Sequence, residues 1–242
     1  MNGSLARALS PEHAVRAKRG PAVVPLRYAA RLVVRHLSTE SKCPRCFLKT
    51  ALCMCSLLPS MPSQSHVVVV MHAYEHLKST NTGRIAHRCL PNSSMVLYGE
   101  RHGPVLPLRT WPEGTTPVVL FPVAGAQPIA DFRGHKNLAL IALDANWRQA
   151  AKLRKHFAVQ SVPFAQAPAG PSTYRLRAST HEGGMSTLEA IARSLAVVED
   201  IDVEPLLRAF AIYQDRLLWL RGSIGRADVA GGVPDDVNRS AR

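Results

Sequence analysis

Four of the chain's five cysteines lie within 13 positions, at Cys43, Cys46, Cys53 and Cys55. Their spacing, C-x2-C followed by C-x-C, places four thiol groups within reach of one another in a single loop. Four thiolates suit a structural zinc ion, which binds sulfur at about 2.3 Å in a tetrahedral arrangement. An iron–sulfur cluster uses the same four ligands, so both kinds of centre stay open. Zinc bound in this way would be structural, because no position is left for a substrate.

The cellular compartment helps to decide between a metal and disulfide bonds. The first residues lack a continuous apolar stretch before a small-residue cleavage site, so they do not resemble a secretory signal. We therefore expect a cytoplasmic protein, and disulfides are rare in a reducing cytosol. A metal site is favoured over a redox pair, a set of disulfides or simple burial. Lys42, Arg45 and Lys49 would partly offset its negative charge, and the isolated Cys89 is expected to be buried.

The charge of the chain indicates a polyanionic partner. Thirty Lys and Arg residues against 17 acidic residues give a net charge of +13. Residues 1–39 hold seven basic residues and one acidic residue, or +6, so the remaining 23 basic and 16 acidic residues still give +7. Nucleic acid or an anionic surface would attract such a body. No apolar run approaches the roughly 20 residues that a membrane-spanning helix needs, so no membrane partner is expected.

A second group of reactive residues follows an apolar stretch that ends near Leu143. Asp144 is expected at the carboxyl end of a strand, and Asn146 and Gln149 have the spacing of a helix-capping box. A carboxylate, a helix start and Arg148 would then meet where ligands bind in open α/β sheets. Asp144 could hold a cation or accept a proton. The residues alone favour equally a purely structural interpretation, with Asp144 and Asn146 as caps and Trp147 in the core.

Two further helix starts are visible, and neither is specific on its own. Ser186 and Glu189 form a capping box after two glycines, and Thr80 to Arg84 precede another helix. The sequence contains neither a G-x-G-x-x-G nor a G-x-x-x-x-G-K-[ST] motif, so a Rossmann nucleotide site and a P-loop lack support. His72 to His76 match H-x-x-E-H, but they follow a strand directly, which argues against a zinc protease.

Apolar periodicity predicts one α/β domain with a mostly parallel sheet. Strands are expected at 66–73, 94–99, 116–123, 137–145 and 172–179, and helices at 81–90, 147–158, 186–199 and 203–220. This domain covers residues 61–221. A small four-cysteine zinc-binding module at 40–60 precedes it, a disordered basic extension occupies 1–39, and a flexible tail occupies 222–242.

In their order and combination these stretches resemble the DTW-domain family of tRNA-uridine aminocarboxypropyltransferases. The matching residues cover roughly 42–192: C-x2-C…C-x-C (Cys43 to Cys55), His72 and Glu75, T-N-T-G-R (Thr80 to Arg84), L-F-P (Leu120 to Pro122), D-x-x-W-R-Q-A (Asp144 to Ala150), Y-R-L-R (Tyr174 to Arg177) and S-T-L-E-A (Ser186 to Ala190). The family motif is D-x-T-W, and Asn146 replaces its Thr. Both residues are good N-caps, so the helix start should survive.

The resemblance implies a SPOUT-related fold with a C-terminal trefoil knot. It implies S-adenosylmethionine as the donor, whose 3-amino-3-carboxypropyl group moves to N3 of a tRNA uridine while 5′-methylthioadenosine leaves. Asp144, Trp147 and Arg148 are then the candidate catalytic residues, with Asp144 as base or orienter, or as partner of the donor's ammonium group. The loops 120–124, 144–147 and 174–179 would hold the adenosine half. The candidate donor-binding residues are Leu120, Phe121, Pro122, Asp144, Arg175, Leu176, Ser186, Thr187 and Glu189.

A tRNA substrate would account for the excess positive charge. The candidate RNA-binding residues are Arg84, Arg88, Lys152, Arg154 and Lys155, although each alone is equally typical of a solvated helix face. No obligate protein partner is evident. Two alternatives stay open: a SPOUT-like RNA methyltransferase, which uses the methyl group of the same donor, and a non-catalytic RNA-binding zinc protein.

Overall fold

Two almost entirely apolar strands form the centre of the sheet. Strand β1 (His66–His72) pairs with β5 (Leu138–Asp144), and every residue of β5 is buried. Burial on both faces is typical of parallel sheets that are covered by helices on each side. The strand order is β2-β1-β5-β3-β6-β4, and each pairing is parallel. The mixed α/β class and the parallel sheet predicted from the sequence are confirmed.

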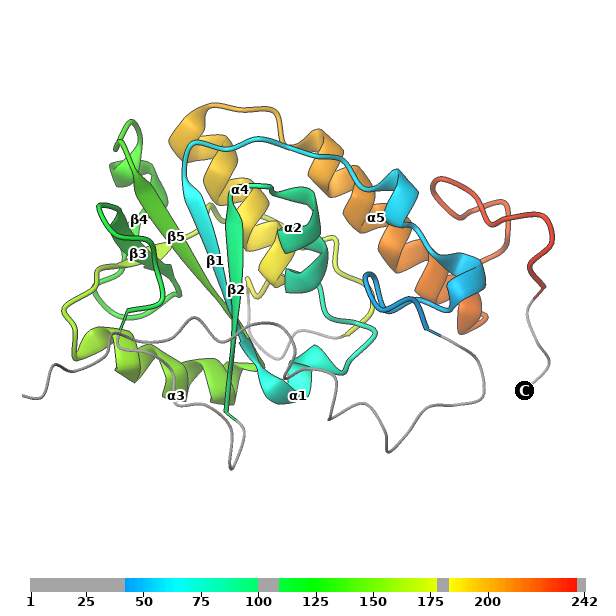
Figure 1. Ribbon diagram of the computed structural model, residues 1–242, viewed down its shortest axis with the longest axis horizontal. Coiled ribbons are helices and arrows are strands. Elements are labelled where there is room, and N and C mark those ends of the chain that lie inside the picture. The colour runs from blue at the N-terminus through cyan, green and yellow to red at the C-terminus, as the bar shows by residue number, and fades with distance from the viewer. Residues whose placement is uncertain (1–41, 100–108, 178–182, 239–242) are drawn as a thin grey trace, which may run out of the picture. The chain divides into compact units, whose positions relative to one another are not determined.

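The computed structural model describes residues 42–99, 109–177 and 183–238 (Figure 1). The other strands are β2 (Ser93–Tyr98), β3 (Thr116–Leu120), β4 (Gln127–Pro128) and β6 (Phe164–Gln166). The α-helices are α1 (Ala73–His76), α2 (Gly83–Cys89), α3 (Trp147–Ala158), α4 (Thr187–Glu199) and α5 (Glu204–Leu220). Short 3-10 helices are η3 (Thr50–Leu52), η4 (Cys55–Leu57) and η5 (Ile129–Phe132). No described helix has the length and apolar character needed to cross a bilayer.

Helices cover both faces of the sheet (Figure 1). Alternate residues of β1 point to opposite faces. Val67, Val69 and Met71 pack with α2, α4 and α5 on one face, whereas Val68 and Val70 pack with α3 on the other. Because β1, β5 and β3 run parallel, their carboxyl ends lie at the same edge of the sheet, where α1 and α3 begin.

Most predicted elements are confirmed, with bounds a few residues shorter or longer. The predicted strand 172–179 is wrong over residues 172–177, and its last two residues lie outside the described part of the chain. The amide of Thr173 donates to Glu189 Oε1 at 2.7 Å, and that of Arg175 donates to Gln214 Oε1 at 2.7 Å. These amides bind helix side chains instead of a neighbouring strand. Strands β4 and β6 were not predicted, because two or three residues show no alternation.

The ends of the domain differ in part from expectation. The predicted extension 1–39 lies outside the described residues. Residues 222–238 of the predicted flexible tail instead pack on the domain, with Val229, Val233 and Val237 buried. Arg226 donates from Nη1 to the Val237 carbonyl at 2.7 Å and from Nη2 to the Pro234 carbonyl at 2.5 Å. Burial of the three valines and the hydrogen bonds from Arg226 to backbone carbonyls hold this segment in place.

Candidate functional site

A pocket of about 220 Å³ opens where the ends of β3, β5 and β6 meet the start of α4. It brings together Trp147, predicted as catalytic, and five of the residues predicted to bind the donor: Leu120, Phe121, Pro122, Ser186 and Thr187. The rings of Trp147 and Phe121 lie 5.6 Å apart, measured between their centroids. The lining is mostly apolar, with a helix start on one side. A flat, apolar group with polar substituents would suit such a site.

The loop after β6 forms the third wall, where the sequence predicted residues 174–179. Gln166, Ala167 and Ala169 line the pocket instead. Arg175 and Leu176, both predicted to bind the donor, lie elsewhere. Arg175 forms an ion pair with Asp215, and buried Leu176 accepts a hydrogen bond at its carbonyl from Arg221. Neither residue lines the pocket, and residues 172–177 do not form the predicted strand; donor binding by the two residues stays a prediction.

Glu189 is buried beneath the pocket and holds its walls together, although it was predicted to touch the donor. It completes the predicted capping box of α4 by accepting from the Ser186 amide at 2.9 Å. It also accepts from the Ser172 hydroxyl at 2.7 Å. One turn further along α4, Arg193 donates to the carbonyls of Gly170 at 3.1 Å and Pro171 at 2.5 Å. Burial raises the pKa of Glu189, but the hydrogen bonds that its carboxylate accepts from Ser186, Ser172 and Thr173 outweigh burial and bring the pKa below its ordinary value.

Asp144 stands at the end of β5 as predicted, but its carboxylate is only 5% exposed and does not line the pocket. Its Oδ1 accepts from the Thr187 hydroxyl at 2.7 Å, and its Oδ2 accepts from the Asn81 amide group. A Cβ atom on Gly83 would lie 2.7 Å from Oδ2, so only glycine allows the start of α2 to approach so closely. Burial raises the pKa of Asp144 against these hydrogen bonds. The carboxylate therefore faces Asn81 and Thr187 and not the pocket, so its catalytic role stays a prediction.

A buried acidic residue follows the carboxyl end of β1; the sequence indicated it in the rejected H-x-x-E-H match and in the family resemblance. Glu75 accepts from Lys78 Nζ at 2.5 Å and pairs with Arg177 at 2.9 Å. Arg177 Nε also donates to the Thr80 hydroxyl at 2.8 Å. Burial raises the pKa of Glu75, but the two cations lower it below its ordinary value. Because His72 caps α1 by accepting from the Tyr74 amide, H-x-x-E-H does not form one helix face and the protease pattern stays rejected.

The predicted RNA-binding residues separate into two groups. Arg84 is buried, so the structure contradicts a contact between this residue and tRNA phosphate. Arg88 on α2 and Lys152 and Lys155 on α3 are exposed, and Arg154 is half-buried. Exposed Arg148, predicted as catalytic, precedes Lys152 by one turn on the same face of α3. This helix begins at the pocket with Trp147, so its basic face starts beside the candidate site.

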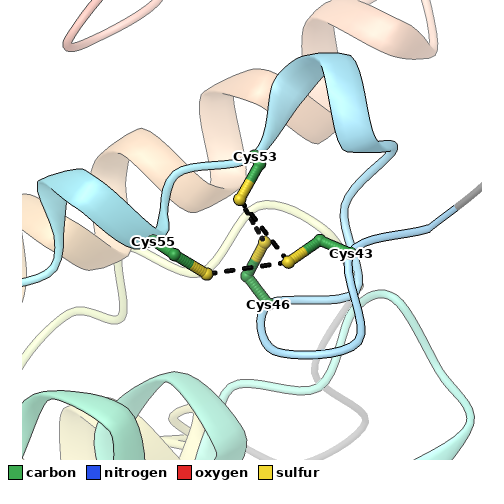
Figure 2. A group of neighbouring side chains, drawn as sticks. All are labelled: Cys43, Cys46, Cys53 and Cys55. Carbon is green, nitrogen blue, oxygen red and sulfur yellow. Dashed lines mark hydrogen bonds between the residues drawn. The ribbon is translucent and has the colours of Figure 1, made fainter.

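The four clustered cysteines point toward one another (Figure 2). Their sulfur atoms all lie within 4.8 Å of one another, and three of the separations are 3.5, 3.7 and 3.9 Å. Tetrahedral zinc with sulfur at about 2.3 Å would hold its sulfurs about 3.8 Å apart. An iron–sulfur cluster distributes its thiolates over several irons and so separates them more widely. The spacing of the four cysteine sulfurs therefore fits a single metal ion.

The loop around these cysteines lowers the pKa of the Cys43 thiol, whereas burial raises the pKa of Cys46 and of Cys55. The amide of Phe47 donates to the Cys43 carbonyl at 2.9 Å, with Phe47 in the left-handed region at φ 63°. Burial raises the pKa of Cys43, but the amides of Cys46 and Arg45 outweigh it and lower the pKa to about 7. Such a thiol gives up its proton readily, as metal binding requires.

Comparison with known proteins places the chain in a family. The sequence model of the DTW domain matches residues 40–218. The chain belongs to the DTW domain family. It is 26% identical over 179 residues to "tRNA-uridine aminocarboxypropyltransferase 2" of Drosophila melanogaster, covering 66% of this chain and 67% of that protein. A mouse (Mus musculus) protein with the same description is 25% identical over 178 residues, covering 69% and 60%. The chain thus spans two thirds or less of these relatives, and no solved structure matches it.

Proposed function

We propose that this DTW-domain protein is a tRNA-modifying transferase that alkylates N3 of a uridine. The donor would be S-adenosylmethionine, and the group transferred its 3-amino-3-carboxypropyl arm. Support comes from the family match and the relatives' names. The observation that carries the proposal is one pocket lined by residues of three predicted stretches: Leu120 to Pro122, Trp147, and Ser186 with Thr187. The proposal includes the SPOUT relationship and its trefoil knot.

The pocket matches part of the donor. Ligand sites for whole drug-sized molecules measure roughly 300–1,000 Å³, so 220 Å³ suits the adenosine half alone. Phe121 and Trp147 would pack against the adenine ring. The start of α4 at Thr187, supported by Asp144, would face the donor's carboxylate, because helix N-termini favour anions. The reactive methylene would then lie toward the pocket mouth.

The reaction would depend mainly on positioning. The N3 proton of uridine passes to solvent, and the electron pair left on N3 attacks the methylene carbon that joins the carboxypropyl arm to sulfur. The bond between that carbon and sulfur breaks with its electron pair moving to sulfur, and 5′-methylthioadenosine leaves. None of the described pocket-lining residues titrates near neutral pH, so the chain would contribute orientation and exclusion of the methyl group.

The basic face of α3 would bind the tRNA backbone. Arg148, Lys152 and Lys155 follow one another at four- and three-residue spacing from the pocket outward. Phosphate contacts of this kind position a nucleic acid without reading its sequence. At the carboxyl end of β1, exposed Tyr74 stacks on His72 with ring centroids 5.3 Å apart. Such an exposed ring offers a stacking surface for an unpaired base.

We also propose zinc as the ion of the four-cysteine centre. The support is that four thiols lie within 4.8 Å of one another in a loop that lowers the pKa of one of them. Elemental analysis of purified protein should give about one zinc per chain. Iron with inorganic sulfide, or less than half an equivalent of any metal, would contradict this assignment.

The decisive experiment offers tRNA and donor labelled separately in the methyl and carboxypropyl positions. The proposal expects label in tRNA from the carboxypropyl arm only, with release of 5′-methylthioadenosine. Label from the methyl group would identify a methyltransferase, and tRNA binding without transfer would identify a non-catalytic RNA-binding protein. Thr187→Val should abolish most transfer, whereas Thr116→Val, at the opposite end of the sheet, should retain it.

A further inference from the structure

Two arginines are buried in the domain without a carboxylate partner. Arg84 on α2 is 3% exposed and Arg216 on α5 is 4% exposed. Neither forms an ion pair with an acidic side chain within the described residues. In the same part of the chain, Nη1 of Arg84 and Nε of Arg216 have no hydrogen-bond partner. A buried charge without a counter-charge costs several kcal/mol, so each guanidinium calls for an anion nearby.

Both arginines contact the loop that carries the four cysteines. Arg216 Nη1 donates to the carbonyls of Leu52 at 2.9 Å and Cys53 at 2.8 Å. The guanidinium of Arg84 lies 3.7 Å from the ring centroid of Phe47, the residue after Cys46. Arg216 therefore reaches the backbone at Cys53, and Arg84 reaches the loop at Phe47, one residue after Cys46.

The electrostatics indicate the same partner. Burial lowers the pKa of Arg216, and the groups that raise it are the thiolates of Cys46 and Cys53. Burial likewise lowers the pKa of Arg84, while Tyr213, Asp144 and Cys46 raise it. Asp144 also accepts hydrogen bonds from Asn81 and Thr187. Tyr213 and Asp144 contribute more than Cys46 at Arg84, and Cys46 is the anionic group that acts on both arginines.

We propose that Arg84 and Arg216 are the counter-charges of the metal centre. Four thiolates and one divalent ion carry a net charge of −2, which two guanidinium groups neutralise. The sequence suggested Lys42, Arg45 and Lys49 for this role. Lys42 and Arg45 are exposed and therefore screened by water, whereas Lys49 is half-buried. The inference rests on the proposed metal centre and does not depend on the transferase reaction.

Arg84 also connects this centre to the junction beside the pocket. Its amide donates to Asn81 Oδ1 at 2.9 Å, and the same Asn81 side chain donates to Asp144. Its Nη2 donates to the carbonyl of His76, at the end of α1. One residue therefore ties the cysteine loop, α1 and the start of α2 together. Arg84 is a positioning residue for the pocket as well as a counter-charge.

The test measures metal affinity in Arg84→Met and Arg216→Met, which keep the length of the side chain and remove its charge. We expect zinc to be held 10- to 100-fold more weakly in competition with a chelator, the usual effect of changing groups around a metal's ligands. Arg84→Lys and Arg216→Lys should recover most of the affinity. Arg208→Met, on the exposed side of α5, is the matched control and should bind zinc like the unchanged protein.

Cobalt substitution provides a second readout that does not depend on stability. Removal of a positive charge raises the energy of the thiolate electrons, so the sulfur-to-cobalt charge-transfer band should move to longer wavelength in both Met variants. Unchanged affinity and an unmoved band would overturn the proposal. Equal losses in the Met and Lys variants with an unmoved band would also overturn it, because they would indicate packing alone. If Arg84→Met does not fold, the Arg216 variants decide. No donor or tRNA is used, so failure of the transferase proposal leaves the result unaffected.

Discussion

At the scale of single residues, Asp144 shows how a correct position can have an unexpected role. The sequence placed this carboxylate at the end of a strand beside a helix start, and the structure confirms both. The neighbouring residues in the sequence could not indicate that the Asp144 carboxylate is buried. It depends on Asn81, Gly83 and Thr187, which come from distant parts of the chain and close over the carboxylate.

Asp144→Asn should reduce stability and donor affinity together. One of its two acceptor oxygens becomes a donor that faces either Asn81 or Thr187, which costs about 1–3 kcal/mol for an unsatisfied buried group. Thermal unfolding and calorimetric binding of S-adenosylmethionine measure the two effects. The exposed Asp131→Asn is the control. A loss of turnover above about 1,000-fold, the order expected for a base, with stability and affinity unchanged, would restore the catalytic assignment.

Ionisation of Glu75 should make the free energy of unfolding depend on pH. Its pKa lies below the ordinary value of 4.5 in the folded state, so its ionised form stabilises the fold. That contribution is fully present above about pH 4.5 and is lost as the pH falls through the folded-state pKa. Glu75→Gln should therefore lower the free energy of unfolding by about 1–3 kcal/mol at pH 7 and flatten its decline below pH 4.5.

Urea unfolding at a series of pH values measures this dependence. Glu113→Gln is the control, because its side chain is 95% exposed and its pairing with Arg109 spans 3.8 Å. Equal slopes below pH 4.5 in the unchanged protein and in Glu75→Gln would contradict the role assigned to the buried carboxylate.

At the scale of elements, α4 organises the pocket. Its capping box could be predicted because Ser186 and Glu189 have the required spacing. The extra bonds of Glu189 and Arg193 to residues 170–173 could not be predicted, because they join segments that carry no shared pattern. The same bonds explain why residues 172–177 are not a strand.

Arg193→Gln should weaken donor binding more than it slows transfer. Loss of the bonds to Gly170 and Pro171 frees the wall formed by Ala167 and Ala169, so KM for the donor should rise about 10-fold while kcat changes little. Arg193→Lys should recover little, because an ammonium cannot bridge several carbonyls as a guanidinium does. Steady-state kinetics measure both constants, with Arg208→Gln as the control. A fall in kcat as large as the rise in KM would contradict a positioning role.

The basic face of α3 should control the salt dependence of tRNA binding. Log affinity falls with log salt, and each phosphate contact removed makes this negative slope less steep by about 0.7–0.9. Lys152→Ala with Lys155→Ala should therefore make the slope less steep by about 1.5. Lys136→Ala, an exposed residue before β5 at the other end of the sheet, should leave it unchanged. Filter binding at several salt concentrations measures the slope, and an unaltered slope in the double variant would exclude α3.

At the scale of the whole molecule, the cysteine module is part of the domain. The sequence predicted its ligands and its bounds at 40–60, since spacing alone identifies a candidate set of metal ligands. Nothing in that spacing indicates that Leu48, Leu52 and Met54 are fully buried in the core shared with α2, α4 and α5. The packed residues 222–238 were missed for the same reason, because which segments share a core depends on the complete topology.

Chelation should therefore destabilise the entire domain. Removal of the ion leaves clustered thiols and two buried arginines, and the free energy of structural zinc sites is free energy of folding. A loss of about 5 kcal/mol would lower Tm by on the order of 10–20 °C. Calorimetry with and without chelator should show one shifted transition. A lost local transition with an unchanged main peak would contradict the shared core.

The pairing of Arg216 with Cys53 joins residues 163 positions apart. A ribosome that adds about 5–20 residues per second needs roughly 8–30 s to span that distance. The nascent chain consequently carries its four thiols for this whole interval before the second guanidinium exists. The centre can reach its final electrostatic balance only after Arg216 has been synthesised.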